Sequence, residues 1–568
     1  MKKSERVFGI DLGTTYSCIS YVDEYGKAII IPNRDGERTT PSVVCFENGC
    51  ASVGSVAKEC APMEPENVCA CIKRQMGNDE YIAQYCGVEY TPEEISSFIL
   101  RKLVQDASDY LNEEIHNVVI TCPAYFFVRE RNATKRAGEL AGLNVLQIVN
   151  EPTAAAVSYG YNEQSDVKTA LVYDLGGGTF DVTVMRFSRE AIEAIYTDGD
   201  HRLGGKDWDD RLVELVAQKF CDETGCSTSP LESPESQAQL LLDVERAKKA
   251  LSSRRQTKIR VSHDGERANI EVTREEFEEI TRDLLERTVD FTRTVLEGAR
   301  ERGAKVEEIL LVGGSSKMPA VMQILEQNFD IPLRLYDPDE AVAKGAAIIG
   351  NNLRLRKLLE QKLSEHEESA TELIVDIVDE VASETGFIPQ TILGAMRKVT
   401  NVSSKSFGTD AVFNHEQYLL YKRDCIIHNR RFDPTDPGSG IRVSNIIYKN
   451  TPLPAIRVHT YSTTVDGQRK ILSSLYENHM GEEAEEFGVE MADCNLLTEE
   501  FIPLPPNLPA GTPLKYTFIL DEEGLLTARV EVIGTDCVYH QRVQTGKARS
   551  DSELRIQEQR CSELIIKD

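Results

Sequence analysis

The feature that most constrains the fold is a repeated strand-and-turn segment. It occurs as Gly9-Ile-Asp-Leu-Gly-Thr-Thr15 and as Tyr173-Asp-Leu-Gly-Gly-Gly-Thr-Phe-Asp181, with the first aspartates 163 residues apart. Each copy follows a strand-like stretch, places an aspartate at the strand end and uses glycine to turn backbone amides toward an anion. One such turn is typical of many proteins, whereas two matched copies indicate duplication. We therefore predict two facing, amide-lined turns that clamp a polyphosphate.

The two strand-end aspartates, Asp11 and Asp174, add a requirement for a cation. Beside phosphate groups they would repel the ligand unless a hard cation such as Mg²⁺ lay between them. Thr14, Thr15 and Thr179 supply hydroxyl donors at the same turns. The pattern therefore predicts a metal-bound polyphosphate.

Two further glycine turns extend this pattern. Gly313 and Gly314 follow a strand-like stretch at 309–312 and would permit close approach of a flat ring or a ribose, and Gly204 and Gly205 form the other turn. The patterns GxxxxGK[ST], GxGxxG, HExxH and GxSxG are absent from the sequence. Their absence argues against P-loop, dinucleotide-binding, zinc-protease and esterase interpretations.

Composition excludes several other classes. A formal charge of -29 opposes nucleic acid and anionic membranes, and no apolar stretch has the length of a bilayer span. We therefore expect a cytoplasmic protein without nucleic-acid or membrane partners. The 14 cysteines are scattered without a CxxC pair, which favours reduced, structural thiols.

The texture of the chain suggests its organisation. We predict an α/β nucleotide-binding domain at 1–352, a helical connecting segment at 353–402, an antiparallel β module at 403–535 and a tail at 536–568. Within the first domain, Thr91 and Thr273 each open a helix through a capping box, and the second helix is expected to run on past Leu284. The β module contains a predicted hairpin at 514–532, and the tail holds at most one short helix.

These motifs together resemble one family. Residues 6–350 are similar to the nucleotide-binding domain of the heat-shock protein 70 family of DnaK-type chaperones, within the actin and sugar-kinase fold. Further matching segments are Ile120-Thr-Cys-Pro-Ala-Tyr-Phe126, Ala137–Asn144, Asn150-Glu-Pro-Thr-Ala-Ala-Ala156 and Asp337-Pro-Asp-Glu-Ala-Val-Ala343. The resemblance implies an actin-like ATPase domain, with two lobes of duplicated RNase-H-like core that close on ATP.

The resemblance also implies catalytic roles. Lys73 matches the family's catalytic lysine beside the γ-phosphate, and Glu151 and Thr179 match residues that order water there. Asp11 and Asp174 match the carboxylates around hydrated Mg²⁺, with K⁺ expected as a second cation held together with Asp181. Asp174 is accordingly expected in the catalytic set as well.

Other positions match the family's contacts to phosphates, ribose and adenine. They are Gly13, Thr14, Thr15, Tyr16, Gly176, Gly177, Gly178, Gly204, Gly205, Glu245, Lys248, Ser252, Gly314, Ser315 and Asp339. Lys249 and Lys317 stand where relatives have arginines that stack on the adenine. Since an ammonium cannot stack like a planar guanidinium, we predict adenine affinity weaker by about 1 kcal/mol.

The β module resembles the family's peptide-binding sandwich at a few points. Ile471 aligns with the floor of the peptide pocket, although the simpler interpretation of this position is a core strand residue. The insertion at 413–445, the helical connecting segment and the short tail all depart from the family pattern. Without the long helical lid, bound peptides are expected to exchange quickly.

The leading hypothesis is an ATP-dependent chaperone-like protein that hydrolyses ATP slowly to control the binding of exposed hydrophobic peptide segments. A co-chaperone and a nucleotide exchange factor are the further expected partners. A nucleotide-sensing interaction module with a dedicated partner and little turnover is the alternative. A sugar kinase of the same fold is disfavoured because the β module would have no task there.

Overall fold

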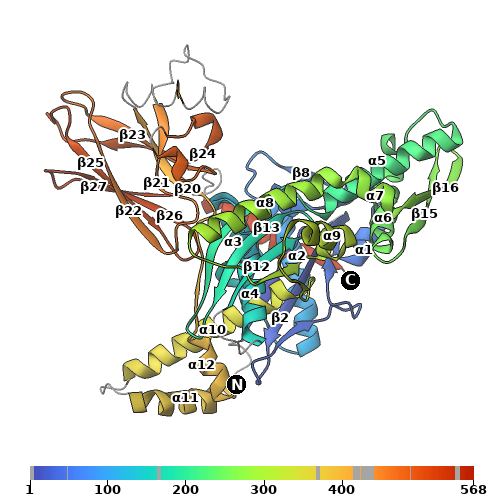
Figure 1. The fold of residues 1–568 in the computed structure, drawn as a ribbon, viewed down its shortest axis with the longest axis horizontal. Coiled ribbons are helices and arrows are strands. Elements are labelled where there is room, and N and C mark those ends of the chain that lie inside the picture. The colour runs from blue at the N-terminus through green and yellow to red at the C-terminus, as the bar shows by residue number, and fades with distance from the viewer. Residues whose placement is uncertain are drawn as a thin grey trace. The chain divides into compact units, whose positions relative to one another are not determined.

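The computed structural model describes residues 6–47, 49–162, 168–365, 371–412, 422–423, 441–485, 488–543 and 551–567. The chain forms two compact units, which Figure 1 shows coloured from the N-terminus to the C-terminus. Unit 1 comprises residues 1–125, 130–399 and 549–568, and unit 2 comprises residues 126–129 and 400–548. In the described part of the chain, no helix combines the length and the apolar character that a bilayer span requires.

Unit 1 contains two sheets with the same strand order. The first sheet is β3-β2-β1-β10-β11 with β4 beside β2, and the second is β14-β13-β12-β17-β18 with β19 beside β14. In each sheet three consecutive strands pair antiparallel. The remaining strands are parallel: β10 pairs with β1 and β11 with β10 in the first sheet, and β17 pairs with β12 and β18 with β17 in the second. This repeated topology agrees with the duplication predicted from the two glycine turns.

The strands of these sheets have the following bounds. In the first sheet they are β1 Val7–Asp11, β2 Tyr16–Val22, β3 Ala28–Ile31, β4 Thr40–Pro41, β10 Asn117–Cys122 and β11 Asn144–Asn150. In the second they are β12 Lys168–Leu175, β13 Phe180–Phe187, β14 Ala191–Asp200, β17 Glu308–Val312, β18 Leu333–Leu335 and β19 Lys398–Thr400.

Helices pack on the sheets or on one another. They are α1 Ser55–Cys60, α2 Pro92–Leu111, α3 Val128–Leu140, α4 Glu151–Asn162, α5 Gly205–Thr224, α6 Pro234–Leu251, α7 Arg274–Ile280, α8 Arg282–Glu301, α9 Pro319–Asn328, α10 Ala341–Glu365, α11 Thr371–Thr385 and α12 Pro389–Ala395. Helices α4 and α10 pack against each other, with α10 on the first sheet and α4 on the second. The capping boxes at Thr91 and Thr273 are both present.

Two predictions about helices need correction. The helix that begins after Thr273 breaks at Thr281, whose hydroxyl donates to the carbonyl of Phe277 at 2.8 Å, so α7 and α8 are separate. In addition, α10 runs through residue 352 without interruption, and α11 and α12 also belong to unit 1. The segment predicted as a connector is therefore packed in unit 1 up to residue 399. Arg356 shows this packing, since its guanidinium donates to the carbonyl of Ala395 at 2.6 Å.

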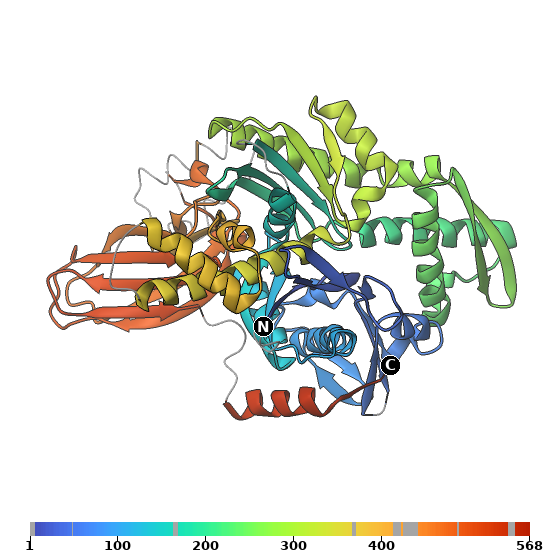
Figure 2. The same ribbon diagram turned by 90° about the horizontal axis from the view of Figure 1, so that it is seen from below.

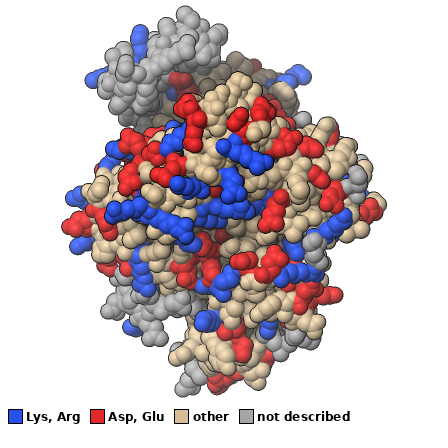
Figure 3. Space-filling view, turned by 90° about the vertical axis from the view of Figure 1, so that its right-hand side faces the viewer, with Lys and Arg blue, Asp and Glu red and all other residues tan. Residues whose placement is uncertain are grey.

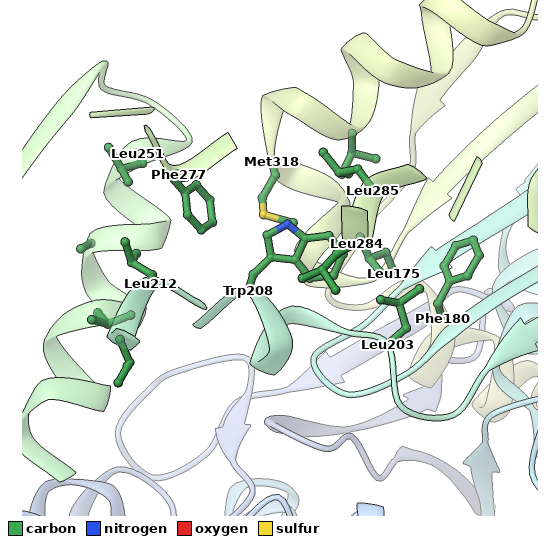
Figure 4. Close-up of a cluster of buried hydrophobic side chains, with 14 of the residues drawn as sticks. Leu175, Phe180, Leu203, Trp208, Leu212, Leu251, Phe277, Leu284, Leu285 and Met318 are labelled. Atoms are coloured by element: carbon green, nitrogen blue, oxygen red, sulfur yellow. The ribbon is translucent and has the colours of Figure 1, made fainter. Parts of the chain in front are cut away.

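The core of the second half of unit 1 surrounds Trp208. This side chain is 1% exposed and packs among apolar residues from the second sheet and from α5, α6 and α8 (Figure 4). Leu175, Leu284 and Met318 are among its neighbours in the cluster. Because Trp208 is the single tryptophan of the sequence, its fluorescence reports on the folding of this unit.

Smaller sheets complete unit 1. Strands β5 Val43–Glu47, β6 Cys50–Val53 and β7 Val68–Ala70 belong to one sheet, β8 Ala83–Tyr85 pairs with β9 Val88–Tyr90, and β15 Gln256–His263 pairs with β16 Glu266–Thr273. Short 3₁₀ turns follow β7 and β17, as η3 Ile72–Gln75 and η5 Gly314–Lys317.

Unit 2 consists of two four-stranded antiparallel sheets that share a hydrophobic core. One sheet has the order β21-β20-β23-β24 and the other β22-β25-β26-β27. Their bounds are β20 Ser406–Val412, β21 Ile441–Ile447, β22 Ala455–Ser462, β23 Lys470–Asn478, β24 Asn495–Pro503, β25 Pro513–Leu520, β26 Leu526–Val532 and β27 Val538–Arg542.

The predicted hairpin is present, with Leu520 opposite Leu526 across the turn. Strand β27 pairs with β26, so the sheet continues beyond residue 535, where the module was predicted to end. Most of the predicted insertion at 413–445 lies outside the described residues, and its last residues begin β21.

Residues after unit 2 return to unit 1. They form α14 Asp551–Glu563, which is the expected short helix, and β28 Ile565–Lys567, which the sequence did not predict. Strand β28 pairs parallel to β6 and gives the sheet order β28-β6-β5-β7. In Figure 2 this segment is the red helix and strand that lie along the blue part of unit 1.

Candidate nucleotide site

The two predicted glycine turns of unit 1 meet. A Cβ added to Gly177 would overlap the hydroxyl of Thr15, and one added to Gly178 would overlap the side chain of Thr14. The first turn is further fixed by Ser42, whose hydroxyl donates to the carbonyl of Gly13 at 2.8 Å. The structure therefore brings together the residues predicted to form the paired turns, and their close contact explains why glycine is required there.

Three aspartates lie at these strand ends, of which Asp174 and Asp181 are buried and Asp11 is partly buried. Asp174 and Asp181 are directly opposite each other in the β12–β13 pair, and Asp11 ends β1. Burial, and then the charge of Glu151, raise the pKa of Asp11 and that of Asp181 to about 7 each. The pKa of Asp174 is raised in the same direction by burial and by the charges of the other carboxylates, Glu151, Asp181 and Asp11 in that order. These side chains are therefore close enough to repel one another when ionised.

Lys73 forms a buried ion pair with Glu151. Lys73 lies in η3 directly after β7, Glu151 begins α4, and Lys73 Nζ is 2.5 Å from Glu151 Oε1. Burial alone would lower the pKa of Lys73, but the charges of Glu151 and Asp11 outweigh it and raise that pKa. The lysine is thus held charged at the centre of a cluster of carboxylates.

This donor set fits a hard divalent cation. Asp11, Asp174 and Asp181 carry carboxylate oxygens, the ligand type that Mg²⁺ prefers, and the single charge of Lys73 does not balance them together with Glu151. Thr121 donates a hydrogen bond to Asp11 at 3.2 Å, and the Tyr125 amide donates one to Asp181 at 3.1 Å. These bonds offset only part of the cost of burying the charged carboxylates, because both pKa values remain raised. A bound cation would remove the remaining repulsion.

The other two glycine turns approach the same place. The amides of Gly205 and Lys206 donate to the carbonyls of Gly176 and Gly177, at 2.9 and 2.8 Å. The hydroxyl of Ser315 donates to the carbonyl of Gly176 at 2.8 Å. All four glycine turns predicted from the sequence therefore converge in unit 1.

The positions predicted for the nucleoside lie beside these turns. Lys248 Nζ donates to the carbonyl of Gly205 and to Asp209, both at 2.7 Å, and Ser252 follows one turn later at the end of α6. A Cβ at Gly314 would lie 3.2 Å from Asp339 Oδ1, and Asp339 is paired with Lys317.

A polar network connects the two halves of unit 1. The Tyr16 hydroxyl donates to Glu245 at 2.8 Å and accepts from Lys58 at 3.0 Å and from Lys249 at 2.8 Å. Glu245 also forms ion pairs with both lysines. Although burial opposes it, the charges of Lys58 and Lys249 lower the pKa of Glu245 to about 2. The Lys249 ammonium therefore contacts Tyr16 and Glu245 in the structure.

The sequence did not identify Lys58 or Arg74. Lys58 lies in α1, 187 positions from Glu245, and no local motif marks it. Arg74 follows the predicted Lys73, and its guanidinium donates to the carbonyl of Gly178 at 2.9 Å and pairs with Asp207 at 2.6 Å. In the sequence, the only indication that Arg74 lies at the site is that it directly follows Lys73.

A cavity of about 570 Å³ lies beside these groups. Thr14, Thr15, Lys58 and Glu245 contribute to its wall, together with apolar residues of the β5–β7 sheet and of α6. On the face of the molecule drawn in Figure 3, Lys and Arg side chains are intermixed with Asp and Glu, and several of the Lys and Arg side chains lie together near its centre.

The predicted peptide residue, Ile471, is half-buried in β23 and packs against the core of unit 2. Its neighbour Leu472 and the facing Phe501 are exposed on the other side of the sheet, and Lys470 Nζ lies 4.0 Å from the centre of the Phe501 ring. This placement agrees with the core alternative and leaves the pocket role a prediction.

A small group of potential metal ligands, with one cysteine, one histidine and one aspartate, lies away from the nucleotide site. Cys226, His263 and Asp264 have donor atoms within 4.8 Å of one another. The Thr228 hydroxyl lies among them, 3.1 Å from His263 Nε2 and 3.6 Å from Cys226 Sγ, and it donates to Asp264. Hydrogen bonding through Thr228 therefore accounts for this arrangement.

Comparison with known proteins gives a consistent result. The family model described as "Hsp70 protein" matches residues 7–365. The chain is 34% identical over 561 residues to the chaperone protein DnaK of Halobacterium salinarum, which covers 97% of this chain and 77% of the relative. It is 44% identical over 357 residues to the chaperone protein DnaK of Thermotoga petrophila and to that of Thermotoga maritima, covering 61% of this chain and 59% of each relative.

Proposed function

Because the chain belongs to the Hsp70 protein family, we propose that it is an ATP-dependent molecular chaperone in which unit 1 hydrolyses ATP and unit 2 binds exposed hydrophobic peptide segments. The family implies an actin-like ATPase domain that binds ATP with Mg²⁺. The observation that best supports the proposal for this chain is the buried Lys73–Glu151 pair, which lies among three carboxylates whose pKa values are raised.

The side chains of this cluster have complementary tasks in hydrolysis. Transfer of the γ-phosphoryl group to water needs positioned charge rather than covalent chemistry. Lys73 would neutralise the equatorial oxygens, while Glu151 holds Lys73 in place and orients the attacking water together with Thr179. Asp11 and Asp174 would hold the hydrated Mg²⁺, and Asp181 would join them in binding K⁺. When bound, Mg²⁺ would neutralise part of the phosphate charge.

The paired glycine turns suit the phosphates. Backbone amides near Gly13 and Gly177 would donate to phosphate oxygens, because glycine places no side chain of its own over these amides. Glu245, Lys248, Ser252 and Asp339 would contact the nucleoside. In this arrangement, the Tyr16–Glu245 network would hold the two halves of unit 1 together around the ligand.

The ATPase proposal is tested with Lys73→Ala. We expect Mg²⁺-dependent hydrolysis in the wild type, loss of hydrolysis by at least a hundredfold in the variant and retained nucleotide binding. Lys305→Ala is the matched control, because Lys305 is an exposed lysine of unit 1. Equal turnover in the wild type and in Lys73→Ala would contradict the proposed role.

Unit 2 is proposed to bind peptide as a β-sandwich. Its two sheets leave edge strands that can pair with an extended segment, and an apolar pocket would select one side chain. Adjacent strand residues point to opposite faces, so Ile471→Ser and Leu472→Ser separate two possible binding faces. Weaker binding of a labelled hydrophobic peptide in the first variant alone, with folding intact, would support the pocket at Ile471.

One observation favours the nucleotide-sensing alternative. The helical segment between the nucleotide site and unit 2 is packed in unit 1 up to residue 399, and such packing restricts the segment that would transmit a nucleotide-dependent change. Peptide stimulation distinguishes the two functions. A severalfold increase in turnover with peptide supports the chaperone, whereas unchanged turnover and a single co-purifying protein support the sensor. Co-chaperone and exchange-factor partners belong to the first proposal only.

A further inference from the structure

Residues 551–567 form part of unit 1 although unit 2 separates them from it in the sequence. Helix α14 packs on α2, and β28 extends the sheet of β5, β6 and β7. The pairing is parallel and in register, with Ile565, Ile566 and Lys567 opposite Cys50, Ala51 and Ser52. We call residues 551–567 the return segment.

A buried charge on α2 depends on the return segment. The Arg560 guanidinium pairs with the Glu94 carboxylate, which is fully buried, and Arg560 Nε lies 2.9 Å from Glu94 Oε1. The other carboxylate oxygen of Glu94 accepts from the Thr91 amide at 2.9 Å in the capping box of α2. Arg560 also lies over the Tyr90 ring, 5.3 Å from its centre. Removing Arg560 would leave a buried carboxylate without its ion-pair partner.

The end of α14 is also held by α2. Arg101 donates to the carbonyl of Cys561, in the last turn of α14, and to that of Leu564, which follows the helix. The side chains of Cys561 and Leu564 are buried. A further ion pair joins Lys567 of β28 to Glu47 of β5. The return segment thus makes specific contacts with both α2 and the small sheet.

This sheet leads directly to Lys73. Its strand order is β28-β6-β5-β7, and β7 continues through Cys71, which has φ of 57°, into η3 with Lys73. Val43, Val68 and Ala70 of the same sheet line the cavity beside the nucleotide site. The return segment therefore borders one edge of a sheet whose opposite edge sets the position of the lysine.

We propose that the return segment is a positioning element for phosphoryl transfer: by adding a second connection between α2 and the β5–β7 sheet, which α2 also contacts directly, it keeps Lys73 against Glu151. This inference rests on the proposed ATPase function. Displacement of a charged group by about 1 Å is enough to lower a rate by up to a hundredfold. The glycine turns proposed to contact the nucleotide belong to other elements, so release of the segment should affect hydrolysis more than binding.

The test uses the full-length protein with three variants. Arg560→Ala removes the ion pair, Ile566→Pro removes a backbone donor in the middle of β28, and the double variant combines both changes. Arg560→Lys is the conservative variant that can still pair with Glu94. Arg555→Ala is the matched control, since Arg555 is exposed on the same helix.

Three measurements are made on each protein: hydrogen exchange of the β6 amides, the ATP dissociation constant and the single-turnover rate of hydrolysis. In the double variant we expect faster exchange at residues 50–53, hydrolysis slower by roughly tenfold and an ATP dissociation constant within about twofold of the wild type. Arg560→Lys should recover most of the rate lost in Arg560→Ala. The Trp208 fluorescence transition verifies that the core of unit 1 remains folded.

Two results would overturn the inference. One is unchanged exchange at β6 in the double variant, which would show that the return segment does not dock. The other is faster exchange with an unchanged hydrolysis rate, which would show that docking does not position Lys73. A wild-type protein that binds ATP without hydrolysing it would instead contradict the proposed function, and the exchange measurement would still report on docking.

Discussion

Asp181→Asn is expected to stabilise the metal-free protein at pH 8. Burial and the charge of Glu151 raise the Asp181 pKa from 3.8 to about 7. A shift of about three pKa units means that ionising this group costs the folded state about 4 kcal/mol. Asparagine removes the charge and its side-chain oxygen can still accept from the Tyr125 amide. The substitution should therefore raise the free energy of unfolding by up to about 4 kcal/mol.

The sign of the pH dependence follows from linkage. Because the folded-state pKa lies above the unfolded value, the folded protein binds more protons between pH 4 and pH 7, and its stability falls as the pH rises through that window. At pH 5 the aspartate is still protonated in the folded state, so the gain from Asp181→Asn shrinks to about 2 kcal/mol. The advantage of the variant should thus grow from pH 5 to pH 8.

The assay is urea unfolding in EDTA, followed by the fluorescence of Trp208 in the core of unit 1. Asp330→Asn, at an exposed aspartate of the same unit, should have a small and pH-independent effect. Adding Mg²⁺ at pH 8 should stabilise the wild type more than Asp181→Asn, because the cation removes the same repulsion. If Asp181→Asn is no more stable than the wild type at pH 8 in EDTA, the ionised Asp181 carboxylate does not destabilise the folded protein, and the reasoning is wrong.

Three further outcomes are expected. Glu245→Gln removes the ion pairs with Lys58 and Lys249 and should speed the release of labelled ADP severalfold in stopped-flow measurements; unchanged release would mean that the network does not retain nucleotide. Replacing Lys249 and Lys317 together by arginine should tighten ATP binding about fivefold by calorimetry, since a guanidinium can stack on adenine, and equal affinity would contradict that reasoning. Gly177→Ala should weaken Mg²⁺-ATP binding by more than about tenfold, because the added methyl group overlaps the facing turn, whereas Gly142→Ala in a remote turn with open space should not.

The sequence was most informative where chemistry is local. A glycine turn after a strand needs only a few neighbouring residues, so both copies and the aspartates beside them were visible in the sequence. The capping boxes at Thr91 and Thr273 are equally local, and both are present in the structure. These short patterns were sufficient to predict that the first two turns face each other and to identify the other two turns.

Long-range partners could not be predicted in this way. Nothing near Lys58 in the sequence shows that its partner is Glu245, because the two are brought together only when both halves of unit 1 have folded. The break at Thr281 depends on one side-chain hydrogen bond that competes with the regular helix, and the apolar spacing continues across it. Strand β28 has three residues, too few for a periodic signal.

The return segment also affects the order in which the protein can mature on the ribosome. Glu47 and its partner Lys567 are 520 positions apart, so β6 is synthesised long before β28 can cover it. During that interval the nascent chain presents an unpaired strand edge, which is a site for association with other chains. Unit 1 thus reaches its final pairing only after unit 2 has been translated, and a large loop must close in this last step.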